Sequence, residues 1–244
     1  MIFSEDEIER YARHLVLAEV GGPGQQALKR ARVTVVGLGG VGGPAALYLA
    51  AAGVGQLVLI DDDAVALSNL QRQVQFAMAD LAAPKVEAAK AGLARLNPHV
   101  RVDAVEERLS LDNAPSLIEG CDLVLDGTDD FATRFAVNAA CVAAGVPLVS
   151  GALGRWSGQV GVFAGRPCYR CLVPEIPPGA ETCARVGVIG ALAGVVGSMA
   201  ALEAVKIITG AGQALTGRLM LYDGLAGTAR TVTVAPDPGC PVCG

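Results

Sequence analysis

This chain is short of histidine, of charged residues and of basic charge in particular. Only 2 of its 244 residues are histidine, 18% are charged, and the formal net charge is -5. Without a basic surplus there is no electrostatic footprint for nucleic acid or for an anionic membrane. The first residues, MIFSEDEIERYARHL, lack a basic start followed by an apolar core, so they indicate neither a secretory signal nor a transit peptide. We therefore expect a cytoplasmic protein without a nucleic-acid partner.

One apolar run, at residues 188–202, is almost long enough to span a bilayer. Glu203 and Lys206 follow it directly, and the run is rich in glycine and alanine rather than leucine. These features favour a buried helix or a helix at a subunit interface. We expect no membrane partner.

The hydrophobic pattern alternates short apolar strands with helices between residues 32 and 151. Such alternation is typical of a parallel, doubly wound sheet with helices on both faces. A helix at 5–17, a Gly-Pro break at 21–24 and a second helix through 28 form an N-terminal helical arm. After residue 151, three further strands, partly antiparallel, flank an apolar helix at 190–208. We predict an α/β, Rossmann-like, doubly wound and mainly parallel sheet that antiparallel strands continue. One domain spans 1–244, with an arm at 1–30 and halves at 31–150 and 151–244.

A glycine-rich turn follows the first predicted strand. Gly37, Gly39 and Gly42 have the GxGxxG spacing, and Asp61 closes the next strand where a ribose-binding acid is expected. Glycine lets backbone amides approach phosphate oxygens, and the helix N-terminus favours their negative charge. This motif alone fits either NAD or ATP.

Charged residues further along favour ATP. A triphosphate needs side-chain cations and a divalent metal held by carboxylate. Arg72 in SNLQRQ, Lys85 at a helix start, and Asp129 with Asp130 at a strand end supply both. Each also has an ordinary explanation: a surface ion pair for Arg72, a solvated helix start for Lys85 and a helix N-cap for Asp129.

Four of the seven cysteines form two CxxC pairs, Cys168 with Cys171 and Cys240 with Cys243. Four thiolates suit a closed tetrahedral structural Zn²⁺ site, which would clamp the C-terminal tail to the middle of the chain. A dithiol redox role for one pair is the alternative. Cys121 and Cys141 are expected to be small core residues.

The motifs GLGGVG, DDDAVALSNLQRQ, PKVEAA, LDGTDDFATR, PLVSGA, PCYRC, TCARVGV and PGCPVCG follow one another along nearly the whole chain. In this order they resemble the HesA/MoeB/ThiF family, the prokaryotic relatives of ubiquitin-activating enzymes. The resemblance implies that Gly40 lies against the phosphates, Asp61 holds the ribose, Asn69, Arg72 and Lys85 contact the triphosphate, and Asp129 binds Mg²⁺. The predicted nucleotide-contacting set is Gly37, Gly39, Gly40, Gly42, Asp61, Asp63, Asn69, Arg72, Gln73, Lys85, Asp129 and Asp130.

The same resemblance implies the reaction and the partners. The substrate would be a small ubiquitin-fold sulfur-carrier protein that ends in Gly-Gly, bound by residues 151–244 and adenylated for molybdopterin or, alternatively, thiamine biosynthesis. Arg13 matches an arginine that the family inserts into the neighbouring subunit's active site, which implies a homodimer. Cys183 aligns with a cysteine that in some members links covalently to the carrier or handles sulfur, and in others is dispensable. No rhodanese extension follows Gly244, so a separate protein is expected to donate sulfur.

Asp130 departs from the family pattern, because related sequences often carry asparagine there. A second carboxylate either strengthens metal binding or repels the triphosphate when no metal is bound.

Two other functions compete with adenylation. An NAD-dependent oxidoreductase would leave the cysteine pairs and Arg72, Lys85 and Asp129 unexplained, and neither His14 nor His99 suits hydride-transfer chemistry. A non-catalytic scaffold would not need the triphosphate residues.

Overall fold

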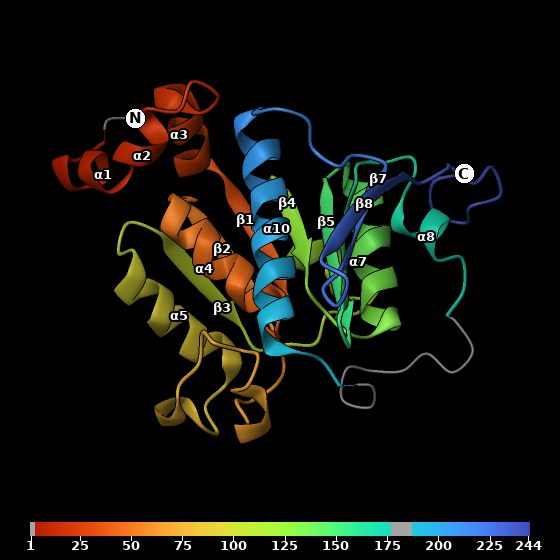
Figure 1. Cartoon of the computed structure of the whole chain (residues 1–244), viewed down its shortest axis with the longest axis horizontal. Helices are drawn as coiled ribbons and strands as arrows, with labels where there is room; N and C mark the ends of the chain where they lie inside the picture. The colour runs from red at the N-terminus through yellow and green to blue at the C-terminus, as the bar shows by residue number, and fades with distance from the viewer. Residues whose placement is uncertain (1–2, 177–186) are drawn as a thin grey trace.

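A computed structural model of the chain describes residues 3–176 and 187–244. Its centre is one eight-stranded sheet with the order β3-β2-β1-β4-β5-β6-β7-β8 (Figure 1). The first five strands in this order, which are β3, β2, β1, β4 and β5, pair in parallel. Strands β6, β7 and β8 add antiparallel pairs. This confirms the predicted parallel sheet with an antiparallel continuation. The strands are β1 (Arg32–Val36), β2 (Gln56–Ile60), β3 (Arg101–Val105), β4 (Leu123–Asp126), β5 (Leu148–Gly154), β6 (Ser157–Phe163), β7 (Arg218–Asp223) and β8 (Thr228–Thr233).

Helices cover both faces of the sheet (Figure 1). One hydrophobic core joins α4 and α10 to the sheet through buried residues such as Leu49, Leu125 and Val196. A second core, on the other face, joins α7 to β4 through Val124 and Val137 and contains Cys121 and Cys141. The described α-helices are α1 (Glu5–Arg10), α2 (Ala12–Leu15), α3 (Gly21–Arg30), α4 (Gly42–Ala52), α5 (Lys85–Leu96), α6 (Ala114–Leu117), α7 (Phe131–Ala144), α8 (Tyr169–Leu172) and α10 (Gly190–Thr209), and the 3₁₀ turns are η1 (Leu67–Asn69) and η2 (Met78–Asp80).

Helix α10 is long and apolar enough, by length and composition, to cross a membrane. It crosses one face of the sheet, where it packs against α4, β5 and β6 (Figure 1). Ala193, Val196 and Ala200 are fully buried there. The apolar run is therefore the core helix of this face, as its glycine and alanine content predicts.

The N-terminal arm differs from the prediction at two points. Tyr11 separates α1 from α2 because its ring is buried against Gly53 and its hydroxyl accepts a 2.9 Å hydrogen bond from Asn97. The predicted break at 21–24 is instead the first turn of α3. Pro23 fits there, since the first turn of a helix does not use its missing N–H.

The last strand lies three residues earlier than the predicted TVTVAP. Asp223 accepts hydrogen bonds from the amides of Leu225 and Ala226, at 2.9 and 3.1 Å. This Asx turn, with Gly227 at φ +66°, closes a tight hairpin that pairs Asp223 with Thr228. The strand therefore begins directly after the turn.

Candidate active site

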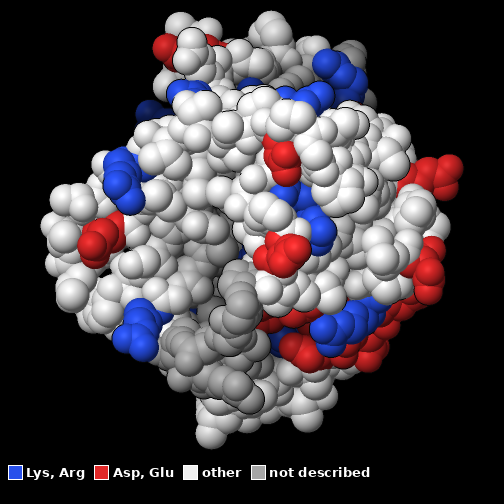
Figure 2. All heavy atoms as spheres, turned by 90° about the vertical axis from the view of Figure 1, so that its right-hand side faces the viewer, with Lys and Arg blue, Asp and Glu red and all other residues white. Residues whose placement is uncertain are grey.

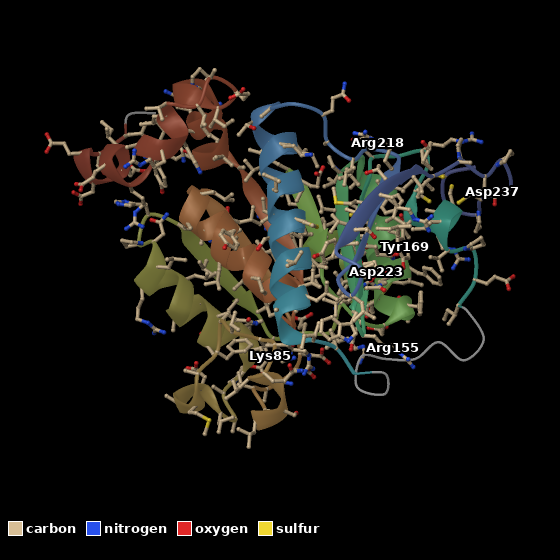
Figure 3. The ribbon with its side chains drawn as sticks, viewed as in Figure 1. Lys85, Arg155, Tyr169, Arg218, Asp223 and Asp237 are labelled. Atoms are coloured by element: carbon tan, nitrogen blue, oxygen red, sulfur yellow. The ribbon has the colours of Figure 1, made fainter. Side chains whose placement is uncertain are left out.

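A cavity of about 580 Å³ opens beyond the carboxyl ends of β1, β2 and β4, where open α/β sheets bind their ligands. Figure 3 shows Lys85 at this end of the sheet, near the start of α10. The volume lies within the range of small-molecule sites. The structure brings eleven of the predicted residues into its lining: Gly37, Gly39, Gly40, Asp61, Asp63, Asn69, Arg72, Gln73, Lys85, Asp129 and Asp130.

The glycine turn is built for close backbone packing. Gly37 adopts φ +80°, and a side chain at Gly42 would place its Cβ 1.9 Å from the Gly37 carbonyl oxygen. Gly42 is the one member of the predicted turn that does not line the cavity, so its function is to let the turn close. Helix α4 begins at this turn without a side-chain cap. The Gly43 amide donates to the Gly39 carbonyl at 3.1 Å, so it is the positive dipole end of α4 that favours an anion here.

Asp61 and Lys85 form a buried charged pair at the end of β2. The Asp61 carboxylate accepts hydrogen bonds from the amides of Leu38, at 2.6 Å, and Asp63, at 2.9 Å. The Lys85 ammonium lies 2.5 Å from Asp63 and 3.6 Å from Asp61. Burial raises the pKa of Asp61 above its ordinary value, although the charge of Lys85 opposes the shift. Lys85 is 4% exposed, so its charge acts in a medium of low dielectric constant, where a phosphate would bind strongly.

The segment after β2 supplies polar groups from the opposite wall. Asn69 ends η1, and its side-chain oxygen accepts a 3.0 Å bond from the Ala66 amide. The Arg72 guanidinium donates to the Ser68 carbonyl at 3.0 Å. Gln73 is 3% exposed, and its Oε1 has no hydrogen-bond partner in the described part of the chain. Because a buried amide oxygen is costly to leave unpaired, Gln73 fits a ligand or a bound ion.

The two acids after β4 have different surroundings. Asp130 is the N-cap of α7, where it accepts a 2.9 Å bond from the Thr133 amide, and it lies 3.3 Å from the Arg108 guanidinium. Asp129 is exposed to the cavity. The N-cap is therefore Asp130, and Asp129 is the better placed of the two to hold a divalent cation through a carboxylate oxygen. In a second acidic group, at 61–63, Asp61 and Asp63 are already paired with Lys85.

Sequence reasoning missed the buried residues behind this wall. Arg134, on α7, donates to Asp126 at 3.0 Å, to Ser150 at 2.9 Å and to the Gly151 carbonyl at 2.9 Å, and it also contacts the Thr128 carbonyl. Arg134 and Asp126 are 5% and 1% exposed. Together they fix the loop between β4 and α7 that carries Asp129. The sequence did contain one signal for this pair, since the apolar strand LVLD ends in an aspartate, Asp126.

The four cysteines of the two CxxC pairs come together next to α7 and α8. Their sulfur atoms lie within 4.8 Å of one another, with 3.6 Å between Cys168 and Cys240 and 3.4 Å between Cys171 and Cys243. These cysteines are not disulfide-bonded. Tetrahedral zinc with bonds of about 2.3 Å requires sulfur separations of about 3.8 Å.

Hydrogen-bond donors surround the cluster, but burial raises the pKa of Cys168 and, together with the neighbouring thiols, raises the pKa of Cys243 to about 12. The side-chain amide of Asn138 points to Cys168 at 3.5 Å, and the Asp237 amide to Cys171 at 3.4 Å. Burial opposes the charged form of Cys240, but the Val242 and Cys243 amides lower its pKa to about 7. The residues therefore fit a Zn²⁺ ion, with Cys168, Cys171, Cys240 and Cys243 as its ligands.

Two predicted residues lie elsewhere. Arg13 is on the surface of α2 and does not line the cavity of its own chain. Cys183 lies outside the described residues, so its predicted role is not tested.

A second cavity, of about 910 Å³, lies over the antiparallel part of the sheet. It shares Ala152, Leu153 and Gln159 with the first cavity. On the side of the molecule that Figure 2 presents, charged side chains gather at the lower right and uncharged atoms cover most of the remaining surface. The two cavities therefore share part of their lining, on β5 and β6.

The ThiF family model matches residues 11–242 of the chain. The chain is 48% identical to a molybdopterin-synthase adenylyltransferase of Salmonella typhimurium, over 99% of this chain and 98% of the relative. It is 46% identical to a sulfur carrier protein adenylyltransferase of Thermus thermophilus, over 100% and 93% of the two chains. It is also 47% identical to a SAMP-activating enzyme E1 of Haloferax volcanii, over 98% and 89%.

Among solved structures, the chain superposes on that of Escherichia coli MccB with ATP, with a TM-score of 0.81 and 23% identity, over 99% of this chain and 75% of the other. That likeness supports the fold. The family match and the near full-length relatives confirm the resemblance found in the motifs, and the chain belongs to the ThiF family.

Proposed function

We propose that this chain uses ATP and Mg²⁺ to adenylate the C-terminal Gly-Gly carboxylate of a small ubiquitin-fold sulfur-carrier protein, in molybdopterin cofactor biosynthesis. This chain covers 98% of the length of the Salmonella relative that is named a molybdopterin-synthase adenylyltransferase. The observation that carries the proposal is the lining of one cavity. A glycine turn, two cations at Arg72 and Lys85, and the carboxylate of Asp129 meet there.

The reaction joins two substrates and needs no covalent bond to the enzyme. A carboxylate oxygen of the carrier attacks the α-phosphorus of ATP, the bond to the β-phosphate oxygen breaks, and pyrophosphate leaves with that electron pair. The product is an acyl adenylate. Lys85 and Arg72 neutralise charge on the phosphates, and the amides of the glycine turn orient them. Mg²⁺, held by Asp129, would supply further charge neutralisation.

The second cavity suits the carrier. Its walls include Gly154 and Gly158, and it shares Ala152, Leu153 and Gln159 with the cavity that contains the glycine turn. These shared residues support a route for a thin Gly-Gly tail toward the nucleotide, and so carrier binding by the half at 151–244.

We further propose that the enzyme works as a homodimer. Arg13 is exposed and lies outside its own cavity, as expected for a residue that completes the site of a second copy. The donation of sulfur by a separate protein, and any covalent role of Cys183, remain predictions.

The experiment is ATP–pyrophosphate exchange with purified protein, Mg²⁺ and a panel of carriers from molybdopterin and thiamine biosynthesis. Each carrier is also tested without its last two glycines. Exchange that requires one intact carrier supports the proposal and names the pathway. No exchange with any carrier, together with tight NAD binding, would refute it.

A matched pair of variants on α5 tests the cavity. Lys85→Met should lower carrier-dependent exchange about 10²- to 10³-fold, because one buried phosphate donor is removed. Lys90→Met, on the exposed side of the same helix, should retain the wild-type rate. Equal rates in the two variants would contradict the role of Lys85.

A further inference from the structure

Tyr169 belongs both to the cysteine cluster and to the nucleotide cavity. It follows Cys168 directly and begins α8, yet its side chain lines the cavity that contains Lys85 and Asp129. Only 3% of it is exposed. Figure 3 shows it beside α7 and α8, on the far side of the sheet centre from Lys85. One residue therefore contacts two sites that are separate in the sequence.

Asn138 fixes Tyr169 to the cluster. Its side-chain oxygen accepts a 2.8 Å hydrogen bond from the Tyr169 amide, and its side-chain nitrogen points to the Cys168 sulfur at 3.5 Å. Asn138 is 1% exposed, so no water competes for these bonds. A shift of Cys168 must therefore move Tyr169 or break a buried bond.

Arg134, one helical turn earlier on α7, links Tyr169 to the cavity wall. Its guanidinium carbon lies 5.9 Å from the centre of the Tyr169 ring, within the range of a cation–π contact. The same guanidinium holds the Thr128 and Gly151 carbonyls. Thr128 packs against Gly37, because a Cβ added to Gly37 would lie 2.9 Å from the methyl group of Thr128. Arg134 is thus a positioning residue for both the glycine turn and the Asp129 loop.

We propose that Asn138, Tyr169 and Arg134 couple the cysteine cluster to the nucleotide cavity, so that a metal ion in the cluster raises the affinity for ATP. A bound metal would fix Cys168, and through it the Tyr169 ring against which Arg134 is held. Because coupling between binding free energies is reciprocal, ATP must raise the affinity for the metal by stabilising the same arrangement. This inference takes one point from the proposed function, namely that ATP binds in the cavity.

The test measures ATP binding by calorimetry, with Mg²⁺ and without carrier, for zinc-loaded protein and for protein stripped by a chelator. Zinc should tighten ATP binding about 5- to 20-fold, a usual size for such coupling. In equilibrium competition for zinc with a chromogenic chelator, the zinc affinity of the protein should rise by the same factor when ATP is added. This second measurement starts from the loaded protein and reads the metal rather than ATP.

Tyr169→Leu should bind ATP weakly and show the same affinity with and without zinc, while it still binds the metal. The control is Tyr48→Leu, the same change at a tyrosine of α4 that is 59% exposed and lines neither cavity. That variant should keep the zinc effect on ATP binding.

The outcomes separate the two proposals. If loaded wild-type protein binds no ATP, the proposed function and this coupling both fail. If it binds ATP equally with and without zinc, and ATP leaves the zinc affinity unchanged, only the coupling fails. Should Tyr169→Leu not fold, the zinc competition with the wild-type protein decides.

Discussion

Replacement of Arg134 by methionine should lower the free energy of unfolding by about 3–5 kcal/mol, because it leaves a buried charge without its partner. Arg134 and Asp126 form an ion pair at 3.0 Å, with side chains 6% and 1% exposed. Methionine fills similar space but donates no hydrogen bond. The carboxylate of Asp126 would keep only the hydroxyls of Ser150 and Thr128 and the Thr128 amide as partners.

Urea unfolding, followed by circular dichroism, measures this loss of free energy. In a thermal melt of a chain of this length, each kcal/mol shifts the melting temperature by about 2–4 °C, so the melting temperature should fall by about 6–20 °C. The double variant Arg134→Met/Asp126→Asn removes the unpaired charge and should recover about half of the loss.

Arg108→Met is the matched control. It removes an ion pair at the same cavity, with Asp130 at 3.3 Å, but the Arg108 side chain is 64% exposed. Such a pair contributes at most about 1 kcal/mol. A loss below about 1 kcal/mol for Arg134→Met, or a double variant no more stable than the single one, would refute the importance of burial here.

Three further predictions concern the acid, the cluster and the second subunit. Burial raises the pKa of Asp61, so the stability due to its protonated form is complete below about pH 4 and is lost as the pH rises through the folded-state pKa. Asp61→Asn cannot titrate and should lack that slope in a pH series of urea unfolding; an unchanged slope would contradict the assignment. Cys240→Ser removes one of four ligands, and bound zinc, measured by mass spectrometry, should fall from about one ion per chain to almost none, whereas full retention would exclude a four-cysteine site. Inactive Arg13→Ala and Lys85→Met proteins, mixed and allowed to exchange subunits, should regain about a quarter of the exchange activity if Arg13 acts in the partner's site; no recovery would mean that it does not.

Local signals in the sequence were enough for most of the fold. Helix α5 begins at Lys85, the predicted helix start. Except for β3, which Glu106 follows, the strands of the parallel half are apolar runs that end in, or are followed by, glycine or aspartate. The differences lie where distant contacts decide. Tyr11 divides the arm because it packs on Gly53 and Asn97, which no periodicity reveals.

The same distinction applies to the site. Residues whose chemistry is unusual for their local position, such as Lys85 at a helix start or the paired cysteines, could be identified from sequence, and the cavity and the cluster bring them together. Arg134 could not, because its partners come from three separate segments, and Tyr169 resembles an ordinary aromatic core residue. The spacing of the cysteines indicates a clamp on the tail, but not that the residue after Cys168 reaches the nucleotide cavity.

The wide separation of the two cysteine pairs has a consequence for synthesis of the chain. Cys168 and Cys240 are 72 residues apart, and α10, β7 and β8 lie between them. At about 5–20 residues per second, the ribosome needs about 4–14 s to make this stretch. During that time the first pair is an incomplete dithiol, open to oxidation or to a foreign metal. A metal ion that needs all four thiolates could therefore bind only after the antiparallel strands have been synthesised, and its binding would join two distant parts of a nearly complete chain.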